Sequence, residues 1–255
     1  MRTIKTLNIF FKNELTSHEI SYFRGAVNAA LEENHSLLFH NHTLDGFRYS
    51  YPLIQYKRIN KKAAIVCIED GTEAIGEFFN IDMRPFSIGN KKEEMVIGNI
   101  VANQFLVQVG QTTYKYKLCN WLPFNAENYK AYQSLERVAE KANLMERVLI
   151  GNILSFLKGV NIFIEEQITC HITDIKDPHT IHYKGIKLMS FNIDFSTNIS
   201  LPPLIGLGKG ASIGYGIVIK NKKNEQGKIS LWCSSSRHSR LYLSNERFEG
   251  YCRCE

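Results

Sequence analysis

The 255-residue sequence has no run of 18 apolar residues, which is about the shortest stretch that reads as a membrane-spanning helix. Its first residues, MRTIKTLNIFFKNE, lack the apolar core of a secretory signal peptide. Hydrophobic residues make up 44%, which is ordinary for a globular protein and excludes disorder throughout the chain. We therefore expect a cytoplasmic protein with no membrane partner, long enough for two domains of about 110 residues each.

Cysteine is sparse: six residues are scattered through strand-like segments and the C-terminal tail. In a reducing compartment such cysteines are more typical of small buried hydrophobic residues than of a disulfide framework. Cys252 and Cys254, with Cys233 and His238 upstream, could bind zinc in principle. Their spacing, however, differs from the usual C-x2–4-C and H-x3–5-H pairs. We expect no metal and no cofactor.

Two common phosphate-binding motifs are missing, although the stretch LPPLIGLGKGASIGYGIVI (201–219) is rich in glycine. A P-loop requires Ser or Thr after its lysine, whereas Lys209 is followed by Gly210. The dinucleotide fingerprint G-x-G-x-x-G fails as well, because Ala211 stands at the third glycine position. The spacing that is present is G-x-G-x5-G-x-G, formed by Gly206, Gly208, Gly214 and Gly216.

Glycines at this density allow positive φ angles and a close approach of the backbone to another group. An ammonium among backbone N–H groups favours an anion such as phosphate. The residue types alone leave one alternative open, a glycine-rich turn that only needs room.

The first half of the sequence predicts a ferredoxin-like domain. Alternation indicates a strand at 3–12, and apolar residues at spacings of three and four indicate a helix from Thr16 or Ser17 to about 32. Strands at 53–59 and 63–69, a helix at 70–79 and strands at 95–109 and 112–119 follow. The resulting β-α-β-β-α-β order is the ferredoxin-like arrangement.

The second half predicts a degenerate copy of that arrangement. Helices are expected at 127–141 and 145–159, the latter capped by Gly159, and strands at 167–176, at 186–195 and from Ile217. We expect an α+β protein of two tandem ferredoxin-like (RRM-like) domains with a C-terminal glycine-rich loop. Their predicted bounds are 1–120 and 121–221, followed by a basic extension at 222–255.

The net charge of +6 is compatible with a nucleic-acid partner without proving one. Residues 222–255 contain seven Lys or Arg and four Glu, which is half of that net charge. A poorly ordered basic tail explains this composition, and an additional, salt-dependent RNA contact is the alternative.

His40 and His42 are the residues best suited to chemistry in the first half. One imidazole can take the proton from a ribose 2′-hydroxyl that attacks the adjacent phosphorus, and the other can protonate the departing 5′-oxygen. A cation nearby would stabilise the charged transition state, and Arg48, Lys57 and Arg58 are close in sequence. Two solvated loop histidines are the alternative.

The segments YFRGAVNAALEENHSLLFHNH and YPLIQYKRINKKAAIVCIEDG resemble the N-terminal half of the repeat-processing CRISPR endoribonucleases, the b-type of the sixth Cas family. SFLKGVNIFIEEQITCHITDI, YKGIKLMSFNIDFSTNISLP and the glycine-rich stretch resemble its C-terminal half. The G-x-G-x5-G-x-G pattern is similar to that of the CRISPR-associated RAMP proteins. Together these segments cover most of residues 5–220.

The resemblance implies an endoribonuclease that cuts CRISPR precursor RNA once per repeat without a metal, with His40 and His42 as the histidine pair. Its crRNA products would carry 5′-hydroxyl and 2′,3′-cyclic phosphate ends, and the protein could pass them to a CRISPR interference complex. A non-cleaving RAMP subunit that only binds RNA in such a complex is the alternative. A homodimer is compatible with open sheet edges, but the sequence does not decide it.

RNA would be read through phosphate contacts and base stacking. We expect the backbone to lie at Lys209 and the loop amides of Gly206, Gly208, Gly210, Gly214 and Gly216, and the scissile region to lie at Arg24, Lys57 and Arg58. Tyr49, Tyr51 and Tyr56 are candidates for stacking, with packing in the sheet as the alternative for some of them.

Overall fold

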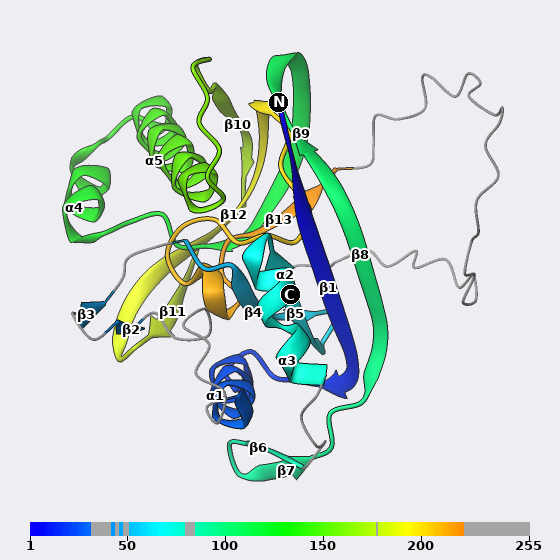
Figure 1. Cartoon of the computed structure of the whole chain (residues 1–255). Coiled ribbons are helices and arrows are strands. Elements are labelled where there is room, and N and C mark those ends of the chain that lie inside the picture. Colours follow the sequence, from blue (N-terminus) through cyan, green and yellow to red (C-terminus); the bar gives the residue numbers. More distant parts are fainter. Residues whose placement is uncertain (32–41, 44–45, 48–50, 80–84, 177, 222–255) are drawn as a thin grey trace, which may run out of the picture.

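The computed structural model describes residues 1–31, 42–43, 46–47, 51–79, 85–176 and 178–221. These residues form two large antiparallel sheets, one from each half of the chain, with helices packed against each (Figure 1). No helix in this part of the chain is long and apolar enough to cross a membrane.

The first sheet has the strand order β4-β5-β1-β8, and all neighbours in it are antiparallel. Its strands are β1 (Arg2–Glu14), β4 (Ile54–Ile59), β5 (Lys62–Ile68) and β8 (Ile97–Val107). Helix α1 (Glu19–Leu31) follows β1, and the short helices α2 (Asp70–Ala74) and α3 (Gly76–Phe79) follow β5. This confirms the predicted ferredoxin-like order, except that the helix expected at 70–79 is broken into two.

Two short strand pairs lie outside both large sheets and were not predicted. They are β2 (His42–Thr43) with β3 (Gly46–Phe47), and β6 (Phe86–Ile88) with β7 (Lys91–Glu93).

Helix α1 begins at the predicted cap. The carboxylate of Glu19 accepts hydrogen bonds from the backbone N–H and the hydroxyl of Thr16, at 2.7 and 2.8 Å, in a variant of the capping box. These bonds and the ammonium of Lys91 lower the pKa of Glu19 to about 2. The apolar face of the helix, with Phe23 and Val27, packs into the core of the first domain.

The second sheet has the order β10-β12-β9-β13, with β11 paired to the other end of β12. Its strands are β9 (Val109–Trp121), β10 (Cys170–Ile175), β11 (His179–Tyr183), β12 (Ile186–Ile199) and β13 (Ile217–Lys220). Helices α4 (Ala126–Ser134) and α5 (Val138–Gly159) connect β9 to β10. The four main strands repeat the arrangement of the first sheet, so the fold is two tandem ferredoxin-like units.

The second unit lacks one helix. Where α2 and α3 lead to the last strand of the first unit, the second has only the glycine-rich stretch and a single 3₁₀ turn, Ala211–Ile213. The glycine-rich stretch therefore occupies the chain position of the missing helix.

The boundary between the units differs from the predicted one. Strand β8 pairs with β1, whereas β9 pairs with β12 and β13, so the chain changes sheets at Gln108. Residues 109–120, which the sequence analysis assigned to the first domain, belong to the second. Strand β11 also begins at His179, between the strands predicted at 167–176 and 186–195, and was not predicted.

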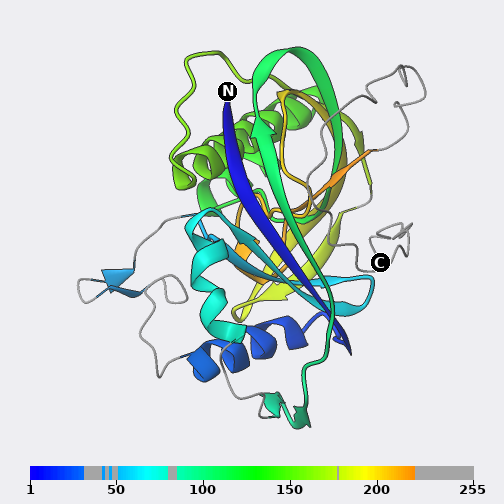
Figure 2. The ribbon, with the colours of Figure 1, turned by 45° about the vertical axis from the view of Figure 1, so that its right-hand side comes forward.

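A shared core joins the two units. Ile4 and Val66 of the first sheet lie in one buried cluster with Trp121 and Leu149 of the second unit. Figure 2 shows β1 crossing the molecule from the side of α5 to that of α1. Gly159 of α5 lies against Tyr51 of the first domain. A β-carbon on Gly159 would overlap the Tyr51 side chain, which explains why a glycine stands at this contact between the units.

Gly159 does not form the predicted cap of α5. The residue with positive φ is Asn161, at 54°, and the N–H of Ile162 donates to the carbonyl of Leu157 at 2.8 Å. Together with the bond from Asn161 to the carbonyl of Lys158, this is a Schellman motif.

Candidate functional site

The glycine-rich stretch folds into a tight loop between β12 and β13. The N–H of Leu207 donates to the carbonyl of Gly216 at 2.8 Å, and that of Val218 to Ile205 at 2.9 Å, so the ends of the loop pair as a hairpin. Gly210 and Gly214 flank the 3₁₀ turn with φ of 73° and 86°. A β-carbon on Gly216 would overlap the carbonyl of Leu207, so the hairpin needs a glycine there.

Both backbone groups of Gly206 bond to the first domain. Its N–H donates to Gln55 Oε1 at 2.8 Å, and its carbonyl accepts from the Tyr51 hydroxyl at 2.8 Å. Gln55 Nε2 in turn donates to the Tyr51 oxygen at 2.9 Å. All three residues are buried, and burial raises the pKa of Tyr51 well above its ordinary value.

Lys57 lies under the loop rather than on the surface. Its side chain is 0% exposed, and its ammonium lies 3.5 Å from the carbonyl oxygen of Ala211 in the 3₁₀ turn. Burial lowers the pKa of Lys57 to about 7. Lys57 therefore has no surface for the direct RNA contact predicted from the sequence, and its position is that of a support beneath the loop.

Arg24 meets the same turn from α1. Its Nη1 lies 3.4 Å from the hydroxyl of Ser212, and the side chain is half-buried. The first domain thus touches the loop from two places in the sequence, through Arg24 of α1 and through Tyr51, Gln55 and Lys57 at and just before β4.

The exposed face of the loop carries cations and aromatic rings. Lys209 is exposed, and its ammonium lies 5.9 Å from the ring centre of Tyr183, as does that of Lys184. The Tyr183 ring packs edge-on against Tyr215 at 5.6 Å. The turn after Tyr183 has positive φ at Lys184 and Gly185, as a two-residue hairpin requires.

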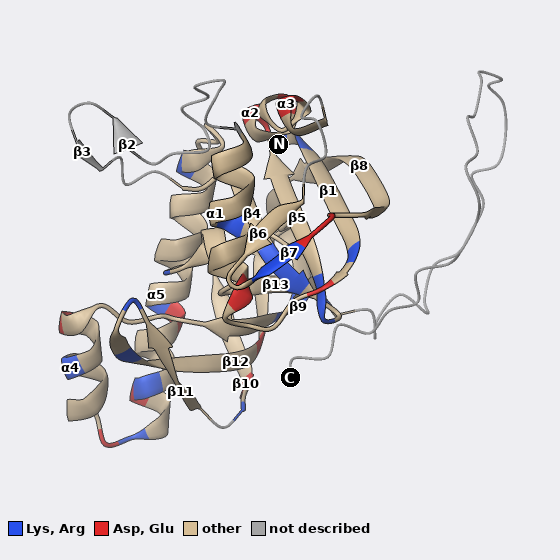
Figure 3. Ribbon diagram, turned by 90° about the horizontal axis from the view of Figure 1, so that it is seen from below, with Lys and Arg blue, Asp and Glu red and all other residues tan. Residues whose placement is uncertain are grey.

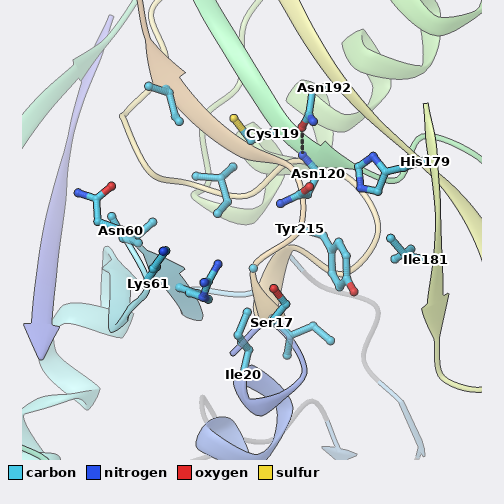
Figure 4. Close-up of a pocket in the computed structure, with 16 residues that line it drawn as sticks. Ser17, Ile20, Asn60, Lys61, Cys119, Asn120, His179, Ile181, Asn192 and Tyr215 are labelled. Atoms are coloured by element: carbon cyan, nitrogen blue, oxygen red, sulfur yellow. Dashed lines mark hydrogen bonds between the residues drawn. The ribbon is translucent and has the colours of Figure 1, made fainter. Parts of the chain in front are cut away.

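A cavity of about 730 Å³ adjoins the loop where the two sheets meet (Figure 4). Its polar lining comes from the β4–β5 hairpin, with Arg58 and Lys61, and from the second domain, with His179, Asn120 and Tyr215. Seen from below, basic segments of both domains lie around β5, β9 and β13 (Figure 3). The cavity therefore joins cationic side chains of the first domain to Tyr215 and His179 of the second.

The structure brings together some of the predicted site residues. Arg24, Lys57, Arg58, Lys209 and the five glycines lie at or beside the loop. His40 and Arg48 lie outside the described residues. His42 is described through its backbone alone, in β2 opposite Phe47. Of the tyrosines proposed for stacking, Tyr51 and Tyr56 are buried, which leaves them to packing, and Tyr49 lies outside the described residues.

Sequence reasoning missed Gln55, Tyr183, Tyr215 and His179. Tyr215 stands inside the second G-x-G, which was a usable signal. The Lys184–Gly185 pair marked a hairpin that would have placed Tyr183. Nothing local distinguishes Gln55, because its role depends on a bond to a residue 151 positions away.

The described residues contain no group of three or more His, Cys, Asp and Glu side chains that could hold a metal ion. The thiols of Cys67 and Cys170 are free and buried, as expected for small hydrophobic residues, whereas Cys119 is disulfide-bonded and departs from that expectation.

Two tandem ferredoxin-like units, the second with a glycine-rich loop in place of a helix, define the chain as a RAMP-type protein. It belongs to the Cas6b family: the profile of the Cas6b N-terminal domain matches residues 2–105, and that of the Cas6b C-terminal domain matches 108–221. The division between the two profiles agrees with the change of sheet at Gln108.

Two solved structures described as Cas6b are similar to this chain, and so is one protein found by sequence. A structure described as "Crystal structure of Cas6b" is 26% identical with a TM-score of 0.78, and the match covers 86% of this chain and 100% of the other. One described as "Crystal structure of CRISPR RNA processing endoribonuclease Cas6b" shares the fold at 23% identity, a TM-score of 0.67 and the same coverage. The protein MJ0978 of Methanocaldococcus jannaschii, itself uncharacterized, is 34% identical over 113 residues, which are 44% of this chain and 76% of that protein.

Proposed function

We propose that this protein is a metal-independent endoribonuclease that cuts CRISPR precursor RNA within each repeat. Membership of the Cas6b family across both domains is the observation that carries this proposal. A neighbour with the same fold is described as a CRISPR RNA processing endoribonuclease, which agrees with it. The basic and aromatic surface beside the glycine-rich loop provides the groups that single-stranded RNA needs.

The proposed reaction is an internal transesterification by His40 and His42. One imidazole accepts the proton of the 2′-hydroxyl as its oxygen bonds to phosphorus, and the other donates a proton to the 5′-oxygen as the P–O5′ bond breaks. No water or metal enters the balance. The products are a 2′,3′-cyclic phosphate and a 5′-hydroxyl. Arg48 is proposed to stabilise the charged transition state.

The loop residues take different parts in this proposal. Gly206 and Gly216 shape the loop, because their N–H groups already donate to Gln55 and to the carbonyl of Asn120. Lys209 supplies the exposed charge that meets the RNA backbone, with Gly208, Gly210 and Gly214 allowing the backbone to approach it. Arg24 and Arg58 add charge at the side of the first domain, and Lys57 holds the loop from below.

Transfer of the product to interference-complex subunits, homodimer formation, RNA contacts by residues 222–255 and cytoplasmic localisation stay predictions of the sequence.

The deciding experiment is cleavage of an end-labelled cognate repeat RNA in excess EDTA, beside substrates that carry a single 2′-deoxy at each candidate position. One cut that survives EDTA and disappears with one 2′-deoxy supports 2′-hydroxyl attack. A cut that needs a divalent cation contradicts the mechanism. Tight binding without any cut favours the alternative of a non-cleaving RAMP subunit.

A further inference from the structure

The cavity at the domain junction has a composition that the proposed reaction does not use. The described residues that line it include Arg58, Lys61 and His179 but no Asp or Glu. A volume of about 730 Å³ lies within the roughly 300–1,000 Å³ of ligand sites. This space suits a single nucleotide and is too small for a duplex. Its charge favours an anionic ligand.

The two sides of the cavity differ in chemistry. Lys61 and Asn60 project from one side, and Tyr215, Ile181 and His179 lie on the other (Figure 4). A phosphate fits the cationic side, and a base fits the side with an aromatic ring and an aliphatic neighbour. A nucleotide has a phosphate for the cationic side and a base for the aromatic side. A purely apolar or a purely anionic ligand would match only one of the two sides.

The polar back of the cavity is held in place. The Asn192 side chain accepts the N–H of Asn120 at 2.7 Å, which fixes its orientation in the wall. A fixed side-chain amide can donate to or accept from the edge of a base without first being ordered, so little entropy is lost on binding.

Tyr215 connects the cavity to the exposed cations of the loop. It lines the cavity and also packs against Tyr183, whose ring lies 5.9 Å from the ammonium of Lys209. An RNA strand held by Lys209 can therefore continue past the tyrosine pair into the cavity.

We propose that this cavity binds one unpaired nucleotide of the RNA strand, with its phosphate at Arg58 and Lys61 and its base against Tyr215 and Ile181. The proposal rests on the proposed function, because it names a position at which the protein binds its RNA substrate, separate from the cleavage site. It accounts for the meeting of Arg58 and Lys61 of the first domain with Tyr215 and His179 of the second in one concave site.

The chain offers a matched control for the phosphate contact. Lys61 lines the cavity, and the neighbouring exposed Lys62 does not. The probe is a fluorescein-labelled single-stranded U10 oligoribonucleotide, with binding followed by anisotropy at several salt concentrations. We expect Lys61→Gln to weaken binding about 3- to 10-fold and to reduce the slope of log K against log salt by about 0.7, the value for one phosphate contact to a single strand. Lys62→Gln should leave both unchanged.

The base contact is tested at Tyr215. Tyr215→Leu should weaken U10 binding about 5- to 30-fold, in keeping with the loss of one stacked base. Tyr215→Phe keeps the ring and should stay within about twofold of the wild type. His179→Ala should weaken binding, whereas His182→Ala, from the same strand but outside the cavity, should not. The affinity for a 12-base-pair RNA duplex should be the same in all variants.

The outcomes separate this proposal from the proposed function. If the wild type cuts repeat RNA while Lys61→Gln and Tyr215→Leu bind U10 like the wild type, the cavity proposal is overturned and the function stands. If cavity variants lose U10 binding as expected while the wild type leaves repeat RNA intact, the nuclease proposal is overturned and the cavity stands. If Tyr215→Phe bound U10 as weakly as Tyr215→Leu, the cavity proposal would also be overturned, because the aromatic ring would then make no contribution to binding.

Discussion

The hydroxyl of Tyr51 donates to the carbonyl oxygen of Gly206 across the domain junction, at 2.8 Å and in a buried position. Tyr51 follows the segment that holds His40 and His42, and Gly206 opens the glycine-rich motif. This bond therefore ties the end of the histidine segment to the start of the loop, with Gln55 bonded to both partners.

Removing that hydroxyl should destabilise the fold. Tyr51→Phe keeps the ring against Phe156 but leaves the buried Gly206 carbonyl without its donor, at a cost of about 1–3 kcal/mol in the free energy of unfolding. Urea titration followed by circular dichroism measures it. Tyr22→Phe is the control, because Tyr22 is 56% exposed. Equal stability of the two variants would contradict the importance of the bond.

Two glycine substitutions should have opposite effects on stability. Gly216→Ala places a β-carbon on the Leu207 carbonyl at a φ of 62°, and positive φ alone costs roughly 1–2 kcal/mol. Gly151→Ala, in helix α5 with open space around it, should stabilise by about 0.5–1 kcal/mol. Thermal melting of both variants would show the contrast, and a Gly216→Ala protein as stable as the wild type would disprove the tight hairpin.

The buried lysine predicts a pH dependence. Burial lowers the pKa of Lys57 from 10.5 to about 7, so between these values the unfolded chain holds a proton that the folded chain lacks. The contribution of Lys57 to stability therefore rises with pH in this window, by at most about 1.4 kcal/mol per pH unit, and is constant below it.

Comparison of the wild type with Lys57→Met isolates this effect, because other titrating groups are common to both. The free energy of unfolding of the wild type, relative to that of the variant, should increase as pH rises from 7 to 10. Urea titrations at each pH unit measure the difference. Lys62→Met changes an exposed site, so its free energy of unfolding should change with pH in the same way as that of the wild type. Parallel curves for Lys57→Met would mean that Lys57 is not buried as an amine.

The proposed catalytic pair predicts a loss of rate with little loss of binding. His40→Ala and His42→Ala should each slow cleavage of repeat RNA by about 10² to 10⁴, the usual contribution of a general acid or base. Single-turnover kinetics measure the rate, and filter binding of a 2′-deoxy substrate measures affinity. His182→Ala controls for the loss of a histidine elsewhere. Unchanged cleavage in both variants would remove the pair from the mechanism.

Lys209 predicts the reverse pattern. Lys209→Ala should weaken RNA binding and lower its salt dependence by about one phosphate contact, while the rate at saturating RNA stays near that of the wild type. Lys130→Ala is a suitable control, since Lys130 is exposed on helix α4. If binding were equally weak in both, the effect would be one of net charge and not of position.

The sequence predicted the element order because alternation and helical spacing are local signals. It misplaced the domain boundary because β8 and β9 are adjacent strands in the sequence, which usually pair, whereas here the chain turns from one sheet into the other at Gln108. Strand β11 was missed because it has only five residues, and the alternation in it is limited to Ile181 and Tyr183.

The site was predicted in part. The glycine spacing located the loop, but residue type could not tell that Lys57 is buried, because β4 is covered on both faces over most of its length. For Tyr51 and Tyr56 the alternative of packing in the fold holds, because both are buried. The contacts of Gln55, Lys57 and Arg24 with the loop join positions more than 150 residues apart, and no local pattern contains them.

The shared core and the Tyr51–Gly206 bond have a consequence for the length of RNA that the protein can accept. Because the two units share one buried hydrophobic cluster, they do not rotate apart as separate domains would. The fold therefore fixes the distance from Gly206 in the loop to Tyr51 at the end of the histidine segment. Under the proposed function, RNA would be cut at a constant number of nucleotides from the point where the loop binds it, so that the ends of successive guide RNAs match.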